Sequence, residues 1–168
     1  MEVRNGIVAF AFGQPWYVLS NLRIQWSAMQ RSNQMQAPIF TQSDIKIDEQ
    51  KFDVTFATQK KEESPPPTLR IAREAVQWAI RHDINQLWII CAKPHWWRCH
   101  RDLHFAIREA KMKGKIKART PVEIMTAERM SWFTLKSTQA RTRSFPEWEK
   151  RENILRRMPM ALYKVVAS

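Results

Sequence analysis

The stretch LWIICAKPHWWRCHRDLHFAIREAK, residues 87–111, decides the expected fold, because an apolar strand leads directly into a long helix. Leu87–Ala92 is a continuous apolar run of strand length, which is typical of a central parallel strand covered on both faces. Pro94 follows at the expected first helical position, where its missing N–H costs no hydrogen bond. A strand end therefore meets a helix N-terminus, the place where open α/β sheets bind anions and nucleotides.

Three polar side chains at this junction are candidates for a binding site. Lys93 and His95 flank the proline, and Arg98 follows one turn later, at the positive end of the expected helix. Asp102 is spaced to hold His95 or Arg98 in place. The alternative is that His95 and Arg98 are ordinary capping and surface residues. An apolar stripe is expected to face the sheet and to leave Arg98 beside it: Trp96, Cys99, Leu103, Ala106, Ile107 and Ala110.

A second apolar strand is predicted near the N-terminus, at Ile7–Phe12, and Gly13 ends it. Ser20 is expected to cap the next helix, whose inward face would carry Leu22, Trp26 and Met29. The turn at Gly13 holds a single glycine. The three-glycine fingerprint of dinucleotide-binding proteins is therefore absent, which argues against classical NAD binding.

The remaining chain alternates predicted strands and helices. Thr68 is expected to cap a strongly amphipathic helix that ends near Arg81, and the charged, proline-rich segment Thr58–Pro67 is expected to be a mobile loop near the site. Other predicted elements are strands at Pro38–Gln42, Lys51–Ala57 (an edge), Lys115–Ala118 and Val122–Met125, and a last helix at Phe145–Met158 anchored by Trp148, Ile154 and Leu155. This alternation predicts one α/β domain, residues 1–168, with three layers and a mostly parallel sheet.

The composition indicates which kind of molecule the protein binds and in which compartment it is expected. Lysine and arginine number 28 against 16 acidic residues, which gives a net charge of +12 and a pI near 10.2 and favours an anionic partner. Cys91 and Cys99 fall on core positions and are expected to be free thiols in a reducing compartment. With no signal peptide and no apolar run long enough for a membrane span, the expected location is the cytoplasm.

The residues Thr68, Ala72, His95 and Arg98 resemble a motif of the SanA/YdcF-like domain-of-unknown-function family, which has a Thr-capped helix and then a strand followed by H-x-x-R. The resemblance covers roughly residues 7–111. It implies a Rossmann-like three-layer fold, a nucleotide-like ligand, with S-adenosylmethionine proposed for one branch, and a bacterial envelope role without a settled reaction.

The chain also departs from this family pattern. Arg70 and Ile71 stand where the family has Glu and Asn, and Ala92 and Lys93 replace the Ser or Thr that precedes the histidine. The glycine-rich turn is reduced to Gly13. Losing the Glu removes a candidate for acid–base chemistry, so the catalytic residues are unknown.

Three functions remain open from the sequence. The first is binding of a small anionic or nucleotide-like molecule by Gly13, Thr68, Lys93, His95 and Arg98, for a transferase or hydrolase reaction. The second is nucleic-acid binding, since aromatic and basic residues alternate at 96–98 and 132–143. The third is a metal ion held by His100 and His104, one helical turn apart; no third ligand is in view, so no metal is expected.

Overall fold

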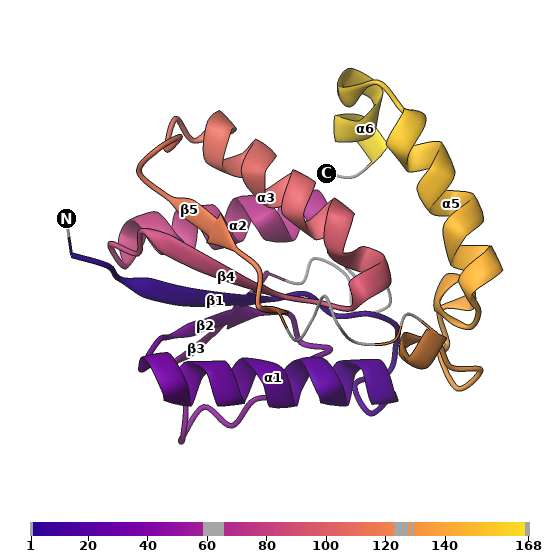
Figure 1. The fold of residues 1–168 in the computed structure, drawn as a ribbon, viewed down its shortest axis with the longest axis horizontal. Coiled ribbons are helices and arrows are strands. Elements are labelled where there is room, and N and C mark those ends of the chain that lie inside the picture. Colours follow the sequence, from indigo (N-terminus) through magenta and orange to yellow (C-terminus); the bar gives the residue numbers. More distant parts are fainter. Residues whose placement is uncertain (1, 59–65, 123–127, 129, 167–168) are drawn as a thin grey trace.

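A computed structural model describes residues 2–58, 66–122, 128 and 130–166. Its core is a five-stranded, all-parallel sheet in the order β3-β2-β1-β4-β5 (Figure 1). The strands are β1 (Asn5–Ala9), β2 (Ile39–Thr41), β3 (Val54–Phe56), β4 (Gln86–Ile90) and β5 (Lys117–Arg119). The predicted three-layer, Rossmann-like α/β class is confirmed, and Lys51–Ala57 does contribute an edge strand.

The two apolar runs that the sequence marked as central strands are neighbours in the middle of the sheet. β1 pairs with β4 from Asn5↔Gln86 to Ala9↔Ile90. Both ladders begin and end about two residues earlier than predicted. The last residues of each run, Phe10–Phe12 and Cys91–Ala92, continue past the ladder as buried chain and lead into the loops at the carboxyl edge.

Helices cover both faces of the sheet, as continuous apolar strands require. α1 (Leu19–Met35) lies on one face, and α2 (Thr68–Arg81) and α3 (Trp96–Glu109) lie side by side on the other (Figure 1). Within β1, Ile7 belongs to the core under α1, whereas Val8 belongs to the core under α2 and α3. The chain therefore changes direction across the sheet between β1 and β4, which makes their carboxyl ends a topological switch point.

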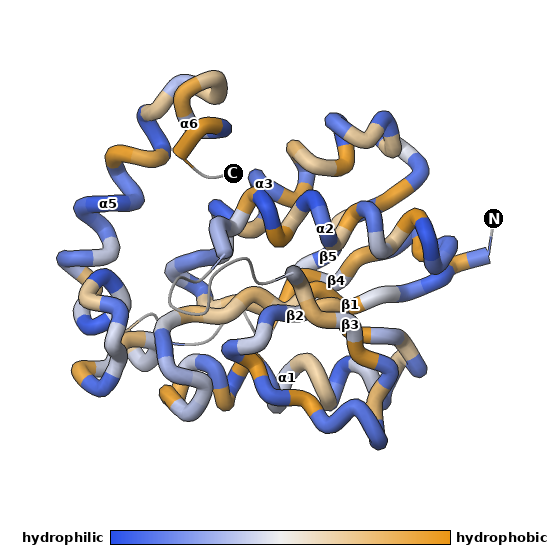
Figure 2. Tube along the Cα trace, turned by 180° about the vertical axis from the view of Figure 1, so that it is seen from behind, coloured by the Kyte–Doolittle hydropathy of each residue, from blue (hydrophilic) through white to orange (hydrophobic). Residues whose placement is uncertain are grey.

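The C-terminal part of the chain stands at this same edge. It contains two 3-10 turns, η2 (Met130–Trp132) and η3 (Ala140–Thr142), and two helices, α5 (Phe145–Arg157) and α6 (Met160–Val166). Leu155 and Tyr163 form a small separate core with Leu69 of α2. Most of α5 is hydrophilic, whereas the central strands are largely hydrophobic (Figure 2). Within the described residues, no helix has the length and hydrophobicity needed to cross a membrane.

Helix α1 differs from its prediction at its start and on its buried face. It begins at Leu19 after Val18, and Ser20 is inside the helix, where its hydroxyl donates to the Phe12 carbonyl instead of capping. Leu22 and Trp26 are exposed, the latter by 64%. Met29 packs against the core as predicted, but the buried face otherwise carries Ile24 and Ala28 together with polar side chains such as Ser20, which hydrogen-bond to the β1–α1 loop.

Three other predictions need correction or lie outside the described residues. Thr68 is the first residue of α2 and makes no capping hydrogen bond, because Pro67 occupies the N-cap. Ile154 is 58% exposed and anchors nothing, whereas Trp148 and Leu155 are buried as predicted. Most of the predicted loop Thr58–Pro67 and of the predicted strand Val122–Met125 falls on residues 59–65 and 123–127, which are not described.

Gly6 of β1 lies directly beneath α2, and replacing it with alanine should destabilise the fold. An added Cβ would lie 2.9 Å from Ile84 Cδ1 and 3.0 Å from the Trp78 ring. Such overpacking costs about 1–3 kcal/mol. Urea unfolding should show this loss for Gly6→Ala and a smaller one when Ile84→Val is already present, because the closest atom is then missing. Equal losses in the two backgrounds would contradict the proposed contact.

Candidate functional site

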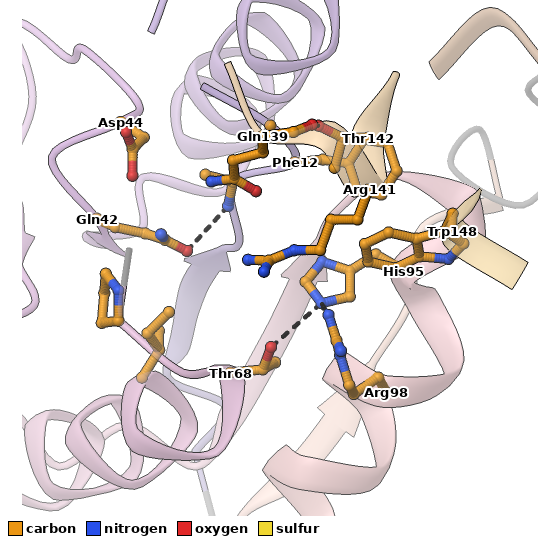
Figure 3. A pocket seen from close by; sticks show the side chains of 14 residues that line it. Phe12, Gln42, Asp44, Thr68, His95, Arg98, Gln139, Arg141, Thr142 and Trp148 are labelled. Atoms are coloured by element: carbon orange, nitrogen blue, oxygen red, sulfur yellow. Dashed lines mark hydrogen bonds between the residues drawn. The ribbon is translucent and has the colours of Figure 1, made fainter. Parts of the chain in front are cut away.

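A small pocket opens at the carboxyl ends of β1, β2 and β4 (Figure 3). Its volume is about 40 Å³, enough for roughly three water molecules, since one needs about 10–15 Å³. It therefore takes the charged head of a ligand and not a whole nucleotide. The lining residues are Ala11, Phe12, Gly13, Gln42, Asp44, Pro66, Thr68, Ile71, His95, Arg98, Gln139, Arg141, Thr142 and Trp148.

His95 lies at the centre of the deepest wall, and its two neighbours are predicted site residues. Arg98 donates to His95 Nε2 through Nε and a terminal nitrogen, at 3.2 and 2.9 Å, and the Thr68 hydroxyl lies 3.2 Å from the same atom. His95 is in η1 (Lys93–His95) and Arg98 is in the first turn of α3, so one short segment positions both. Thr68 comes from the start of α2. The structure thus brings three of the predicted residues together.

The protonation state of His95 follows from these bonds. A guanidinium only donates, so Nε2 accepts and the ring proton is on Nδ1. Burial, followed by the positive charges of Arg98, Arg141 and Arg151, lowers the pKa of His95 well below its usual value. His95 is therefore a neutral side chain that can donate through Nδ1–H. Its Nδ1 is buried without a well-formed hydrogen bond.

Arg98 is buried, although the helix phase places it beside the apolar stripe and the alternative made it a surface residue. It is 6% exposed, its CZ atom lies 5.0 Å from the centre of the Trp148 ring, and one terminal nitrogen is 2.8 Å from Glu152 Oε1 of α5. It is buried because α5, distant in sequence, covers this side of α3. Asp102 does not hold His95 or Arg98: its carboxylate binds Arg101 and the Tyr163 hydroxyl.

Gly13 lines the pocket in a backbone conformation that favours glycine. Its φ is +94°, and a Cβ there would lie 3.1 Å from the hydroxyl oxygens of both Ser137 and Thr142. These two hydroxyls are 2.7 Å apart, and Ser137 also accepts from the N–H of Gln14. The turn after β1 is therefore bound to residues 137–142, which close one side of the pocket.

The wall opposite His95 carries acceptors. Gln42 accepts the Ala11 N–H at 3.0 Å, and Asp44 accepts from Gln14 at 3.1 Å. Burial raises the pKa of the Asp44 carboxyl, and hydrogen bonds from Gln14 and Gln42 and the charge of Lys46 only partly oppose that rise. Both side chains follow β2, so the pocket has one acceptor wall and one donor wall (Figure 3).

Arg141 of η3 is the pocket residue that sequence reasoning missed. Its guanidinium extends into the pocket between His95 and the acceptor wall (Figure 3). It has no hydrogen bond or ion pair with the residues that the structure describes. Burial, with repulsion from Arg151 and Arg98, lowers its pKa to about 10, so it remains a cation at neutral pH. It is the best placed side chain to meet an incoming anion.

Arg141 reaches the site with Gln139 and Thr142, which share its stretch without helical or strand periodicity, and with Trp148 from the predicted helix α5. The only sequence signal was the local density of basic and hydroxyl residues at 136–144. Lys93, by contrast, was predicted to contact the ligand but is only half-buried in η1 and is not among the lining residues.

His100 and His104 form a separate pair on the surface of α3. Their Nε2 atoms are 3.1 Å apart, and the His100 ring stacks on Trp96. Burial lowers the pKa of both imidazoles. Among the described residues, no group of three or more potential ligands surrounds them or any other point.

No protein-family model matches the chain, and no curated protein resembles it closely enough to count as a relative. The resemblance to SanA/YdcF-like proteins therefore rests on Thr68, Ala72, His95 and Arg98 alone, and it stays a prediction.

Substituting Arg98 should destabilise the protein, contrary to the expectation for a residue beside the core. Arg98→Ala leaves the Glu152 carboxylate buried without its closest partner, and breaking a buried ion pair costs about 3–5 kcal/mol. Arg81→Ala, at an exposed arginine ending α2, is the control and should change stability by less than about 0.5 kcal/mol. Equal effects in chemical unfolding would show that the Arg98–Glu152 pair does not form.

His95 should make stability depend on pH. Its folded pKa lies below the unfolded value of 6.5, so its contribution is present above pH 6.5 and is lost as the pH falls toward the folded pKa. The difference in unfolding free energy between wild type and His95→Asn should therefore shrink from about pH 7.5 to about pH 5.5. His82→Asn, at an exposed site, is the control. A difference independent of pH would mean that His95 is not held neutral.

Proposed function

We propose that this protein binds a small anionic or nucleotide-like molecule, whose charged head enters the pocket at the carboxyl ends of β1, β2 and β4. The observation that carries this proposal is the Arg141 guanidinium in a partly buried pocket, where no carboxylate of the described residues pairs with it. A buried cation without a counter-charge is costly, and a bound anion removes that cost. Support also comes from the start of α2 at Thr68, since first-turn N–H groups and the helix dipole favour anions.

The pocket residues have distinct parts in this proposal. Arg141 meets the anion, and neutral His95 and the backbone N–H of Thr68 supply hydrogen bonds. Arg98 orients His95 through Nε2 and is itself held by Glu152. The pocket takes a carboxylate, the anionic group of S-adenosylmethionine, or a phosphate, that of a nucleotide. The cytoplasm remains the proposed location.

Nucleic-acid binding has less support from the structure. Trp97 lies under Arg101 and Arg156, and Trp96 stacks on His100 while its N–H donates to Thr120. These rings already have partners, whereas single-strand binding needs aromatic faces open to bases. The net charge of +12 keeps the alternative open. It predicts binding to an oligonucleotide that falls steeply with salt concentration.

The test of the proposal is Arg141→Gln. A screen of phosphate, acetate and nucleoside monophosphates by thermal stability and calorimetry should find an anion that binds the wild type. The substitution should weaken that binding by about tenfold to a hundredfold, the effect of losing one hydrogen bond to a charged group. Stability of the free protein should not fall, because Arg141 makes no ion pair with described residues.

Lys136→Gln is the matched control. Lys136 is exposed in the same segment, so this substitution removes one positive charge without touching the pocket. It should leave small-anion binding unchanged. If Lys136→Gln weakens binding as much as Arg141→Gln does, the anion is attracted by net charge and not by the pocket. If no small anion binds, the proposal is wrong.

A further inference from the structure

The strongest unexplained feature beside the pocket is an excess of positive charge on one buried and three partly buried arginines. Arg98 lies 2.8 Å and Arg151 3.9 Å from the same Glu152 oxygen, and Arg101 lies 3.2 Å from Asp102. With Arg141 in the pocket, four guanidinium groups adjoin two carboxylates, an excess of two positive charges. Within the described residues, the carboxylates that pair with these arginines do not neutralise this excess of positive charge.

Asp44 lines the same pocket, but it forms no ion pair with these arginines among the described residues, and its carboxylate accepts a hydrogen bond from Gln14. Helix α5 instead places Arg151 beside Arg98 at the single carboxylate of Glu152. Because partly buried charges are stabilised by pairing, we expect a ligand at this wall to supply the missing negative charge.

We propose that the head group recognised here is a dianionic phosphoryl group of a phosphate monoester, bound with its oxygens toward Arg141, His95 and Thr68. This inference rests on the proposed function and specifies its ligand. A monoanion, such as a carboxylate or sulfate ester, leaves one positive charge uncompensated, and a dianion leaves none. The pocket's small volume fits a phosphoryl group whose ester substituent stays outside.

Donors beyond the arginines favour the same group. His95 is 5% exposed, and its Nδ1–H faces the Ala11 backbone without a well-formed hydrogen bond. The first-turn N–H groups of α2 add further donors, whereas the Thr68 hydroxyl already donates to His95 Nε2. A phosphoryl group presents three acceptor oxygens in different directions, which a planar carboxylate does not. Asp44, across the pocket, is left to accept a hydrogen bond from the ester part of the ligand.

Methyl phosphate and methyl sulfate give a direct test, because they share shape and size and differ in charge. At about pH 7.5 methyl phosphate is mostly dianionic, since the second pKa of such esters is near 6. Calorimetry at this pH should show methyl phosphate binding about tenfold or more tightly than methyl sulfate, since hydrogen bonds between ionised groups are the strong ones. Below about pH 5.5 the ratio should approach one.

Titration of the protein works against this result and cannot mimic it. The groups around the pocket are Asp44 after β2, His95 in η1, Arg98 in α3, Arg141 in η3, and Arg151 and Glu152 in α5. Protonation of Asp44, Glu152 or His95 at low pH makes the site more positive, which favours the dianion over the monoanion. A ratio that falls toward one as the pH falls therefore reports the second ionisation of methyl phosphate.

Arg151→Gln tests whether the excess positive charge sets the preference for a dianionic ligand. Arg151 does not line the pocket, so direct contacts stay in place while the excess falls from two charges to one. Methyl sulfate should still bind, and the preference for methyl phosphate should drop by about tenfold. An unchanged preference would overturn the charge argument. Melting temperatures measured on both proteins exclude loss of folding as the cause.

The outcomes separate this inference from the proposed function. If both esters bind the wild type equally and Arg141→Gln removes both, the pocket is an anion site and the phosphoryl inference is wrong. If acetate binds more tightly than methyl phosphate, the head group is a carboxylate and the inference is again wrong. If none of the three binds, both the proposed function and this inference fail.

Discussion

The ion pair between Arg98 and Glu152 is the constraint on which the rest of the site depends. Glu152 is 2% exposed and comes from α5, whereas Arg98 begins α3, so the pair joins the C-terminal segment to the central strand–helix unit. With its charge balanced, Arg98 turns its remaining N–H groups to His95 Nε2. This fixes the tautomer of the histidine, and the proton on Nδ1 follows. The most polar wall of the pocket is thus set by one buried carboxylate that never reaches the pocket.

Placing α5 against the carboxyl edge also explains why the site is built from both ends of the chain. Trp148 donates to the Pro94 carbonyl and packs against Phe12 and His95, so the loops after β1 and β4 share one aromatic cover. Burial behind this cover strengthens each electrostatic contact, because fewer water molecules screen it. The same burial raises the cost of leaving Arg141 without an anion. The position of α5 therefore determines both the burial of the pocket beneath Trp148 and the cost of the uncompensated Arg141 charge.

The sequence predicted the parts of this protein that depend on local patterns. Apolar runs identified β1 and β4, and the period of 3.6 residues identified α2, α3 and α5 with the correct inward faces in α2 and α3. It failed where a tertiary contact decides the role of a residue. Ser20 binds a loop carbonyl instead of capping α1, and Arg98 is buried because α5 covers it. Neither contact follows from helical periodicity, because the partner of Ser20 lies across a turn and the partner of Arg98 lies in another helix.

The residues of the candidate site likewise divide into those that local sequence patterns predict and those that tertiary contacts place. Gly13, Thr68, His95 and Arg98 were identifiable because each lies at a strand end or a helix start, positions that a parallel sheet gathers at one edge. Arg141 belongs to a segment held there by hydroxyl and backbone hydrogen bonds to the turn after β1, which leave no periodic trace. Trp148 lies in the predicted helix α5, but its hydrogen bond to the Pro94 carbonyl joins segments distant in sequence. The sheet therefore fixes where a ligand binds, and the irregular C-terminal segment fixes the charge that the ligand must carry. Since only the first follows from periodicity, the location of the pocket was predictable and the identity of its principal cation was not.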